Sequence, residues 1–377
     1  MLKAKLGEQL GEGGEGIVYA LPDCDQFLAA YRLKIGTVHG KGPFVFKHYH
    51  SDPDWQRVVR LVKWLEERAW SVRNEISDTT TWPLVLVTDP KPDNSPTPGS
   101  SGIVMRRLDD EFFMTLQTMG RSARRYRVVD YLSWNTTQAA QVAGFEFPSL
   151  QQRLNILASI ARTFTLLHTH DLHYGDINPN NIVLGPNWNQ PRIMLVDCDS
   201  IRTGHTNEGP PLNAPGWGPP EGGASNATDC YKFTLLIART LGCSTDQAAL
   251  VAAASGQRLG ISHQLNNMLL AGLNTSPSQR PTMAELGKAL AYEATNTATR
   301  TLPSELPAPP PTQRTQTVKP PRPKQPHTQQ PPTRQPPQPP PTPYRPTPHT
   351  PPGGPQQHPP RTPQPQQPNP SRLDSVP

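Results

Sequence analysis

The chain has 377 residues, of which 34% are hydrophobic and 48 are proline, and its formal net charge at pH 7 is +6. Residues 301–377 hold 29 of these prolines and eight Lys or Arg against two Asp or Glu, so the whole net charge lies there. The other 300 residues carry 28 basic and 28 acidic side chains. A basic nucleic-acid-binding domain is therefore not expected, and no nucleic acid is predicted as a partner.

The C-terminal segment cannot build a packed core, because it offers too little apolar surface to offset the entropy of ordering its backbone. We expect residues 297–377 to form a disordered, basic, Pro-rich tail. Its composition is that of polyproline II ligands, so a protein that binds the tail is one expected partner. A solubilising spacer is the alternative interpretation.

The remaining composition points to a cytoplasmic protein without membrane contact. The four cysteines form no C-x-x-C pair, so neither disulfides nor structural zinc is expected. No window of 18 apolar residues is present, and the first residues lack the apolar stretch of a signal peptide.

The first hundred residues are predicted to be rich in strands, with one helix. Residues 6–20 have the pattern of a strand, a glycine-rich turn and a second strand. A strand is predicted over 44–47, and two more over 82–87 and 102–105. Ser51 to Pro53 is a helix-start signal, and apolar residues follow it at helical spacing: Trp55, Val58, Val59, Val62 and Leu65.

The pattern changes to helices after Leu108. A long buried helix is predicted from about Leu154 to His170, and a stretch rich in Gly, Pro, Asn and Asp follows over 171–227. Four more helices are predicted, over 228–242, 246–255, 261–273 and 283–295. A strand-rich half followed by a helix-rich half predicts an α+β protein with two lobes and a cleft between them.

Residues 10–19 contain the pattern G-x-G-x-x-G, from Gly11 to Gly16. Dinucleotide-binding proteins use the same spacing, but there the glycines open a helix. Here a β-branched and aromatic run follows, which favours a hairpin that folds over phosphates through its backbone amides. An ordinary glycine-rich turn is the structural alternative.

Two further segments carry candidate chemistry. Lys47 ends a predicted strand, where an inward lysine could hold nucleotide phosphates and an outward one would only be a solvated side chain. The stretch 174–200 places Asp176, then Asn181 five residues later, then Asp197 sixteen beyond that, each beside an apolar run. This order matches D-x-x-x-x-N and a divergent D-F-G, the catalytic and metal-binding loops of protein kinases.

Later motifs fit the same order. Gly218 to Glu221 resembles the A-P-E motif, Arg280 lies in a segment like the one that pairs with its glutamate, and Asp229 opens an apolar helix. Over residues 5–296 the chain thus resembles the eukaryotic-like protein kinase superfamily. The resemblance is closest to a bacterial branch with G-G-E-G-x-V-Y, G-D-[IV]-N-x-x-N and D-x-D-S motifs. It implies an N-lobe over 1–108 and a helical C-lobe over 109–296.

The resemblance also implies the roles of individual residues. Asp176 would orient the acceptor hydroxyl and take its proton, Asn181 and Asp197 would bind Mg²⁺ or Mn²⁺, and Lys47 would hold the α- and β-phosphates of ATP. Glu221, Arg280 and Asp229 would have structural roles. Residues of the glycine loop and of the segment between the lobes would contact ATP: Gly11, Gly13, Gly14, Gly16, Val18, Met105 and Arg107.

The chain departs from the family in its loops. Tyr174 and Gly175 replace the His and Arg before the catalytic aspartate, so switching by phosphorylation of Thr203 or Thr206 is not expected. Asn178 stands where serine/threonine kinases usually carry a lysine. The pair that follows Asp197 is Cys-Asp instead of Phe-Gly, which removes the usual packing switch.

The helix glutamate that would pair with Lys47 has two candidates. Glu66 follows Val59 and Val62 at helical spacing and is preferred to Glu67. The predicted function is that of an ATP-dependent protein kinase acting on Ser or Thr of a protein substrate. The alternatives are a pseudokinase scaffold that acts through its tail, and a kinase-fold phosphotransferase for small molecules.

Overall fold

The computed structural model describes residues 6–31, 33–39, 42–51, 53–88, 101–118, 121–133, 146–204, 213, 215–244, 251, 253–255 and 259–297. By its internal contacts the chain divides between Arg314 and Thr315, and every described residue belongs to the first unit. The predicted tail, apart from Thr297, and the predicted helix 246–255, apart from four residues, lie outside the described residues, as does Thr206.

The N-terminal part is built on one antiparallel sheet of six strands in the order β1-β2-β4-β6-β5-β3. β1 and β2 form the predicted hairpin, and β4 pairs with β2 on one side and β6 on the other. The strands are β1 (Gln9–Glu12), β2 (Gly16–Leu21), β3 (Leu33–Gly36), β4 (Phe44–Tyr49), β5 (Val85–Thr88) and β6 (Gly102–Arg106).

Among the residues that the structure describes, three helices accompany this sheet, where the sequence predicted one. The predicted helix is α2 (Trp55–Glu66), and Asp54 caps it by accepting a hydrogen bond from Arg57 N. The prediction missed α1 (Cys24–Ala29), which has six residues and is held by Phe27 against Phe46. It also missed α3 (Trp70–Thr79), because Ile76 is the only fully buried residue of that helix and gives almost no periodic signal.

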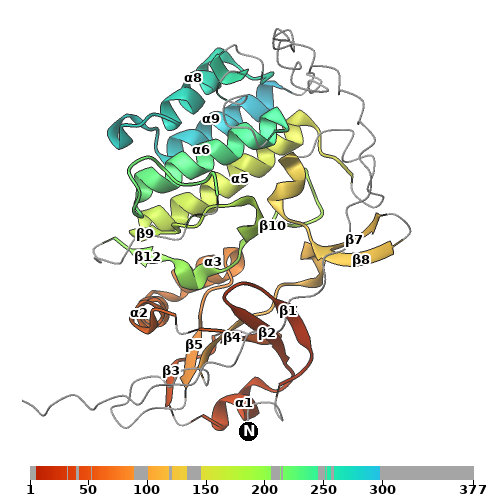
Figure 1. Cartoon of the computed structure of the whole chain (residues 1–377), viewed down its shortest axis with the longest axis vertical. Helices are drawn as coiled ribbons and strands as arrows, with labels where there is room; N and C mark the ends of the chain where they lie inside the picture. Colours follow the sequence, from red (N-terminus) through yellow and green to blue (C-terminus); the bar gives the residue numbers. More distant parts are fainter. Residues whose placement is uncertain are drawn as a thin grey trace, which may run out of the picture. The chain divides into compact units, whose positions relative to one another are not determined.

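The C-terminal part is helical, as predicted. The long helix is α5 (Leu150–Thr169), and α6 (Asn226–Gly242), α8 (His263–Gly272) and α9 (Met283–Asn296) follow. Capping boxes at Ser149, Ser225 and Thr282 explain where three of the helices begin. Figure 1 shows these helices packed together, separated from the six-stranded sheet by the loops around β9 (Leu172–His173) and β12 (Arg202–Thr203). The predicted α+β class, with a β-rich and a helical part, is confirmed.

Short elements fill the segment between α5 and α6. β9 (Leu172–His173) pairs with β12 (Arg202–Thr203), and β10 (Ile182–Leu184) pairs with β11 (Ile193–Leu195). Short 3-10 turns, η4 (Pro179–Asn181) and η5 (Cys198–Ser200), precede β10 and follow β11. Thr81 N donates to the carbonyl oxygen of Leu195 at 2.9 Å, which connects this segment to the N-terminal part.

The remaining elements lie between β6 and α5, apart from one turn between α8 and α9. Two 3-10 turns, η2 (Asp110–Phe112) and η3 (Val129–Ser133), flank a hairpin of β7 (Phe113–Thr118) and β8 (Arg121–Tyr126). Another 3-10 turn, η6 (Pro277–Gln279), precedes α9. Among the described residues, no helix is both long and apolar enough to cross a membrane.

Candidate active site

The glycine-rich hairpin of β1 and β2 leaves open space around its backbone. A Cβ added at Gly11, Gly13 or Gly14 would meet no other atom within 4 Å. Gly16 differs, because a Cβ there would lie 2.3 Å from the carbonyl oxygen of His48, so pairing with β4 requires this glycine. The first three glycines are needed neither by their neighbours nor by a positive φ, and they leave room for phosphates to approach the backbone.

Lys47 lies on β4 and is 4% exposed. Its Nζ contacts three carboxylates: Glu15 at 2.9 Å, Asp197 at 3.3 Å, and both oxygens of Asp199 at 3.1 and 3.0 Å. Burial by itself lowers the pKa of Lys47, but the three carboxylates outweigh it and raise the pKa above its usual value. Three carboxylates around one ammonium group leave the site with an excess of negative charge, which suits a divalent cation.

The prediction that Glu66 pairs with Lys47 is wrong in this structure. Its carboxylate accepts a hydrogen bond from the Thr37 hydroxyl at 2.8 Å. The end of α2 near Lys47 is its first turn, where Arg57 Nε donates to the carbonyl oxygen of Asp199. Glu66 is the last residue of the helix, about 13 Å further along its axis at 1.5 Å per residue.

The loop before β10 holds Asp176 and two asparagines. Oδ2 of Asp176 accepts hydrogen bonds from Asn181 Nδ2 at 2.8 Å and from Asn178 Nδ2 at 3.2 Å. Burial raises the pKa of Asp176, while these two bonds and the charge of Lys232 act in the opposite direction. The half-buried carboxylate is thus fixed by amide donors, with one oxygen left for another partner.

Asp197 follows β11 and has a left-handed backbone, with φ 55° and ψ 42°. A non-glycine residue rarely adopts this conformation, and such strain concentrates at functional sites. The β10–β11 hairpin brings Asp197 close to Asn181, because Val196 N donates to the carbonyl oxygen of Asn181 at 3.0 Å.

These two residues fit a magnesium ion. Asn181 uses its Nδ2 on Asp176 and keeps its Oδ1 open, and the side chain of Asp197 is 52% exposed. The described residues include no group of three or more His, Cys, Asp or Glu placed to hold a metal. An ion here would take its other ligands from phosphates and water, as Mg²⁺ usually does.

Asp229 holds the loop that carries Asp176 through hydrogen bonds to the backbone. It is fully buried, and its carboxylate accepts hydrogen bonds from Tyr174 N at 2.8 Å and Gly175 N at 2.9 Å and lies 3.1 Å from His168 Nε2. The expectation that it opens its helix is wrong, because Ser225 caps α6 and Asp229 is the fourth residue of the helix, in its first turn. Gly175 has a φ of 74°, which explains a glycine at this position.

Two other side chains fix the same loop. Lys232 of α6 is 1% exposed and donates to the carbonyl oxygen of Gly175. The buried Tyr174 donates its hydroxyl to the carbonyl oxygen of Val196, next to Asp197. Burial lowers the pKa of Lys232, and the charges of Asp229 and Asp176 counteract this. The loop that carries Asp176 is therefore attached to both α6 and the end of β11.

The expected pair of Glu221 and Arg280 is present. Two parallel hydrogen bonds join the guanidinium to the carboxylate, at 2.6 and 2.8 Å, and Arg280 also donates to the carbonyl oxygens of Ala227 and Asn274. Bidentate pairs of this kind are among the stronger charge-assisted contacts. The segment around Glu221 is thus connected to α6 and to the turn before α9.

Replacing Arg280 is expected to destabilise the fold. Arg280→Ala leaves the Glu221 carboxylate and two carbonyl oxygens without their donor, so the free energy of unfolding should fall by about 3 kcal/mol. Urea denaturation followed by circular dichroism measures this. The exposed Lys288→Ala is the control and should stay within about 0.5 kcal/mol of wild type. Equal stability of the two variants would contradict a structural role for the pair.

Two predicted ATP contacts lie at and beyond the end of β6. Met105 is buried and packs in one cluster with Val45 on the face of β4 that carries Lys47, and Val18 packs against this cluster. Arg107 N donates to the carbonyl oxygen of Pro43 at 3.0 Å, and its guanidinium lies 3.6 Å from Asp110. The backbone amide and the side chain of Arg107 thus each have a partner in the structure.

Sequence reasoning missed three side chains of the site. Asp199 was considered only as a replacement for glycine, although a second carboxylate two residues after Asp197 was a visible signal. Lys232 interrupts an otherwise apolar helical run, which indicates a buried charge with a partner. Glu15 lies among the glycines of the hairpin, and no pattern in the sequence showed that it would reach Lys47.

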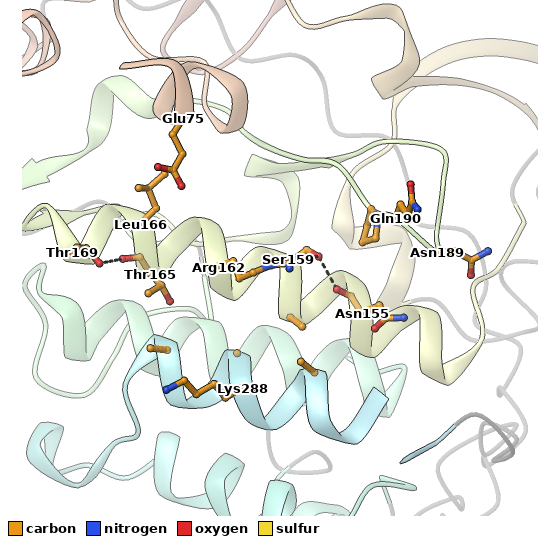
Figure 2. Close-up of a pocket in the computed structure, with 15 residues that line it drawn as sticks. Glu75, Asn155, Ser159, Arg162, Thr165, Leu166, Thr169, Asn189, Gln190 and Lys288 are labelled. Carbon is orange, nitrogen blue, oxygen red and sulfur yellow. Dashed lines mark hydrogen bonds between the residues drawn. The ribbon is translucent and has the colours of Figure 1, made fainter. Parts of the chain in front are cut away.

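A cavity of about 880 Å³ lies elsewhere, between α5, α9 and the loop 189–191, with Glu75 of α3 at its edge. Figure 2 shows Arg162 and Lys288 on its helical walls, and the dashed lines mark hydrogen bonds within α5. None of the predicted site residues lines it. It is therefore separate from the site around Lys47 and Asp176.

No family model and no curated protein matches the chain. Among solved structures, a double mutant of the PknI kinase domain from Mycobacterium tuberculosis is similar with a TM-score of 0.48 and 16% identity, covering 77% of this chain and 94% of that chain. A similarity at this level does not indicate a function, so the proposed function is argued from the site residues.

Proposed function

We propose that the chain is an ATP- and Mg²⁺-dependent protein kinase that phosphorylates Ser or Thr, with lobes over residues 1–108 and 109–296. The observation that carries the proposal is the convergence of four predicted residues from two distant segments of the chain. Lys47 contacts Asp197, the backbone of Asn181 is bonded beside Asp197, and the side chain of Asn181 is bonded to Asp176.

The residues have distinct tasks in this proposal. A bound Mg²⁺ would neutralise charge on the phosphate oxygens, held by Asn181 Oδ1 and the Asp197 carboxylate. Lys47 binds the phosphates, and the open backbone around Gly11, Gly13 and Gly14 covers them. Asp176, fixed by its amide donors, orients the acceptor hydroxyl and receives its proton. Most of the rate enhancement then comes from positioning and from charge stabilisation in a protected site.

A labelled-ATP assay on the full chain tests the acceptor class. With γ-labelled ATP and Mg²⁺, we expect label on Ser or Thr of a generic protein substrate, and none with Asp176→Asn. Small hydroxyl compounds serve as alternative acceptors in parallel reactions. Label that appears only on small molecules would favour the small-molecule phosphotransferase, and no transfer to any acceptor, with ATP still bound, would favour the pseudokinase.

Activity should not depend on phosphorylation of Thr203. This residue lies on β12 and is paired with Leu172. Gly175 stands before Asp176, where the resemblance would place the arginine that binds a loop phosphate. Lys232, the buried cation near Gly175, is 1% exposed and cannot reach a surface phosphate. Thr203→Ala, alone and with Thr206→Ala, is therefore expected to keep activity within about twofold of wild type. Loss of most activity in a folded variant would indicate a phosphate switch.

A further inference from the structure

The three carboxylates around Lys47 differ in how firmly they are held. The Asp199 side chain is 5% exposed and contacts Nζ through both oxygens, at 3.1 and 3.0 Å. The side chains of Glu15 and Asp197 are 56% and 52% exposed, and each contacts Nζ through one oxygen. A buried charge is costly to separate from its partner, whereas an exposed one is easily rehydrated. Asp199 is thus the fixed partner among the three.

Asp199 is also held by groups other than Lys47. The Tyr49 hydroxyl donates to Oδ2 at 2.5 Å, and Arg57 Nε donates to the backbone carbonyl at 3.2 Å. Tyr49 lies two residues after Lys47 on the same face of β4, so one strand carries both donors to this carboxylate.

Glu15 is placed differently. It lies in the glycine-rich turn, and its contact with Lys47 Nζ at 2.9 Å is made by an exposed side chain. The Glu15 carboxylate therefore contacts Lys47 on the side where the glycines would cover nucleotide phosphates. A phosphate and this carboxylate would compete for the same ammonium hydrogens, and like charges at that distance repel.

We infer that Asp199 is the positioning residue for Lys47, and that Glu15 is an anion that the nucleotide phosphates displace from it. This inference rests on the proposed function. The carboxylate that pairs with Lys47 thus comes from the loop after β11, whereas the sequence analysis predicted it to come from Glu66 of α2. The ion pair of Lys47 consequently does not depend on Glu66, the acidic residue of α2. Arg57 of α2 instead donates through its side-chain Nε to the carbonyl oxygen of Asp199.

Nucleotide binding by full-length variants tests this assignment. ATP with Mg²⁺ and adenosine are each titrated calorimetrically into wild type, Asp199→Asn, Glu15→Gln and Glu66→Gln. Asp199→Asn should weaken ATP binding about tenfold or more. Adenosine binding should be unchanged, because the phosphates are the part of the nucleotide that Lys47 contacts. Glu15→Gln should bind ATP at least as tightly as wild type, and Glu66→Gln should equal wild type.

The outcomes separate the inference from the proposed function. Wild-type ATP affinity in Asp199→Asn, or a loss in Glu15→Gln as large as that in Asp199→Asn, would overturn the inference alone. Equal losses for ATP and adenosine would show a general structural defect and would also overturn it. If wild type binds no ATP, the proposed function fails and the inference fails with it. Should Asp199→Asn not fold, Tyr49→Phe replaces it and should weaken ATP binding about threefold with adenosine unchanged; unchanged ATP binding would then overturn the inference.

Discussion

Lys47→Met and Asp197→Ala are each expected to lower the rate of phosphoryl transfer by about a thousandfold while the protein stays folded. Lys47 supplies the buried positive charge of the site, and Asp197 supplies an exposed carboxylate beside it. Preorganised charges in a closed site contribute about 3–4 kcal/mol each to lowering the barrier, which corresponds to roughly this factor. Transfer from γ-labelled ATP, measured at saturating ATP and Mg²⁺, gives the rates.

The control for this pair is Lys63→Met, which removes an exposed lysine from α2. It should keep the wild-type rate and the wild-type melting temperature. A near wild-type rate in either purified site variant would contradict the kinase assignment. A lost rate together with a lost melting transition would instead show that the residue holds the fold.

Asp229→Ala is expected to reduce the free energy of unfolding by about 3–5 kcal/mol. The carboxylate is fully buried, and its removal leaves the amides of Tyr174 and Gly175 without acceptors. It also leaves the ammonium of Lys232 with less negative charge nearby. Breaking a buried charge network of this kind costs several kcal/mol. Guanidinium denaturation measures the loss.

The matched control is Asp25→Ala, which removes an exposed aspartate from the first turn of α1. We expect a change of at most about 0.5 kcal/mol there. A loss below about 1 kcal/mol in Asp229→Ala would show that other contacts hold the loop of Asp176. Asp229→Asn, which keeps one acceptor oxygen, should fall between the alanine variant and wild type.

Much of the fold could be predicted from local patterns. The hairpin of β1 and β2 follows from glycines flanked by β-branched and aromatic residues, and α5 follows from its apolar spacing. The elements that were missed are short or weakly patterned. α1 has six residues, and α3 buries only Ile76, so neither leaves a helical period that could be recognised.

The site was predicted less completely, because its contacts join distant segments. Asp176, Asn181 and Asp197 are close in sequence, and the β10–β11 hairpin explains their proximity. The partner of Lys47 is 152 residues away. Helical spacing predicted Glu66 on the apolar face of α2, where it is half-buried, but it could not show which end of α2 lies near Lys47. Tertiary contacts with η5 decide that question.

In the proposed function, Asp176 receives the proton of the acceptor hydroxyl in a site that binds ATP. Single-turnover transfer from pre-bound, γ-labelled ATP, with nucleotide binding measured on the same samples, tests it most directly. We expect wild type to transfer label to a Ser- or Thr-containing peptide. Asp176→Ala should bind ATP with wild-type affinity and transfer at least about a hundredfold more slowly. Transfer by Asp176→Ala at the wild-type rate, or ATP binding by wild type with no transfer to peptide, would contradict the claim.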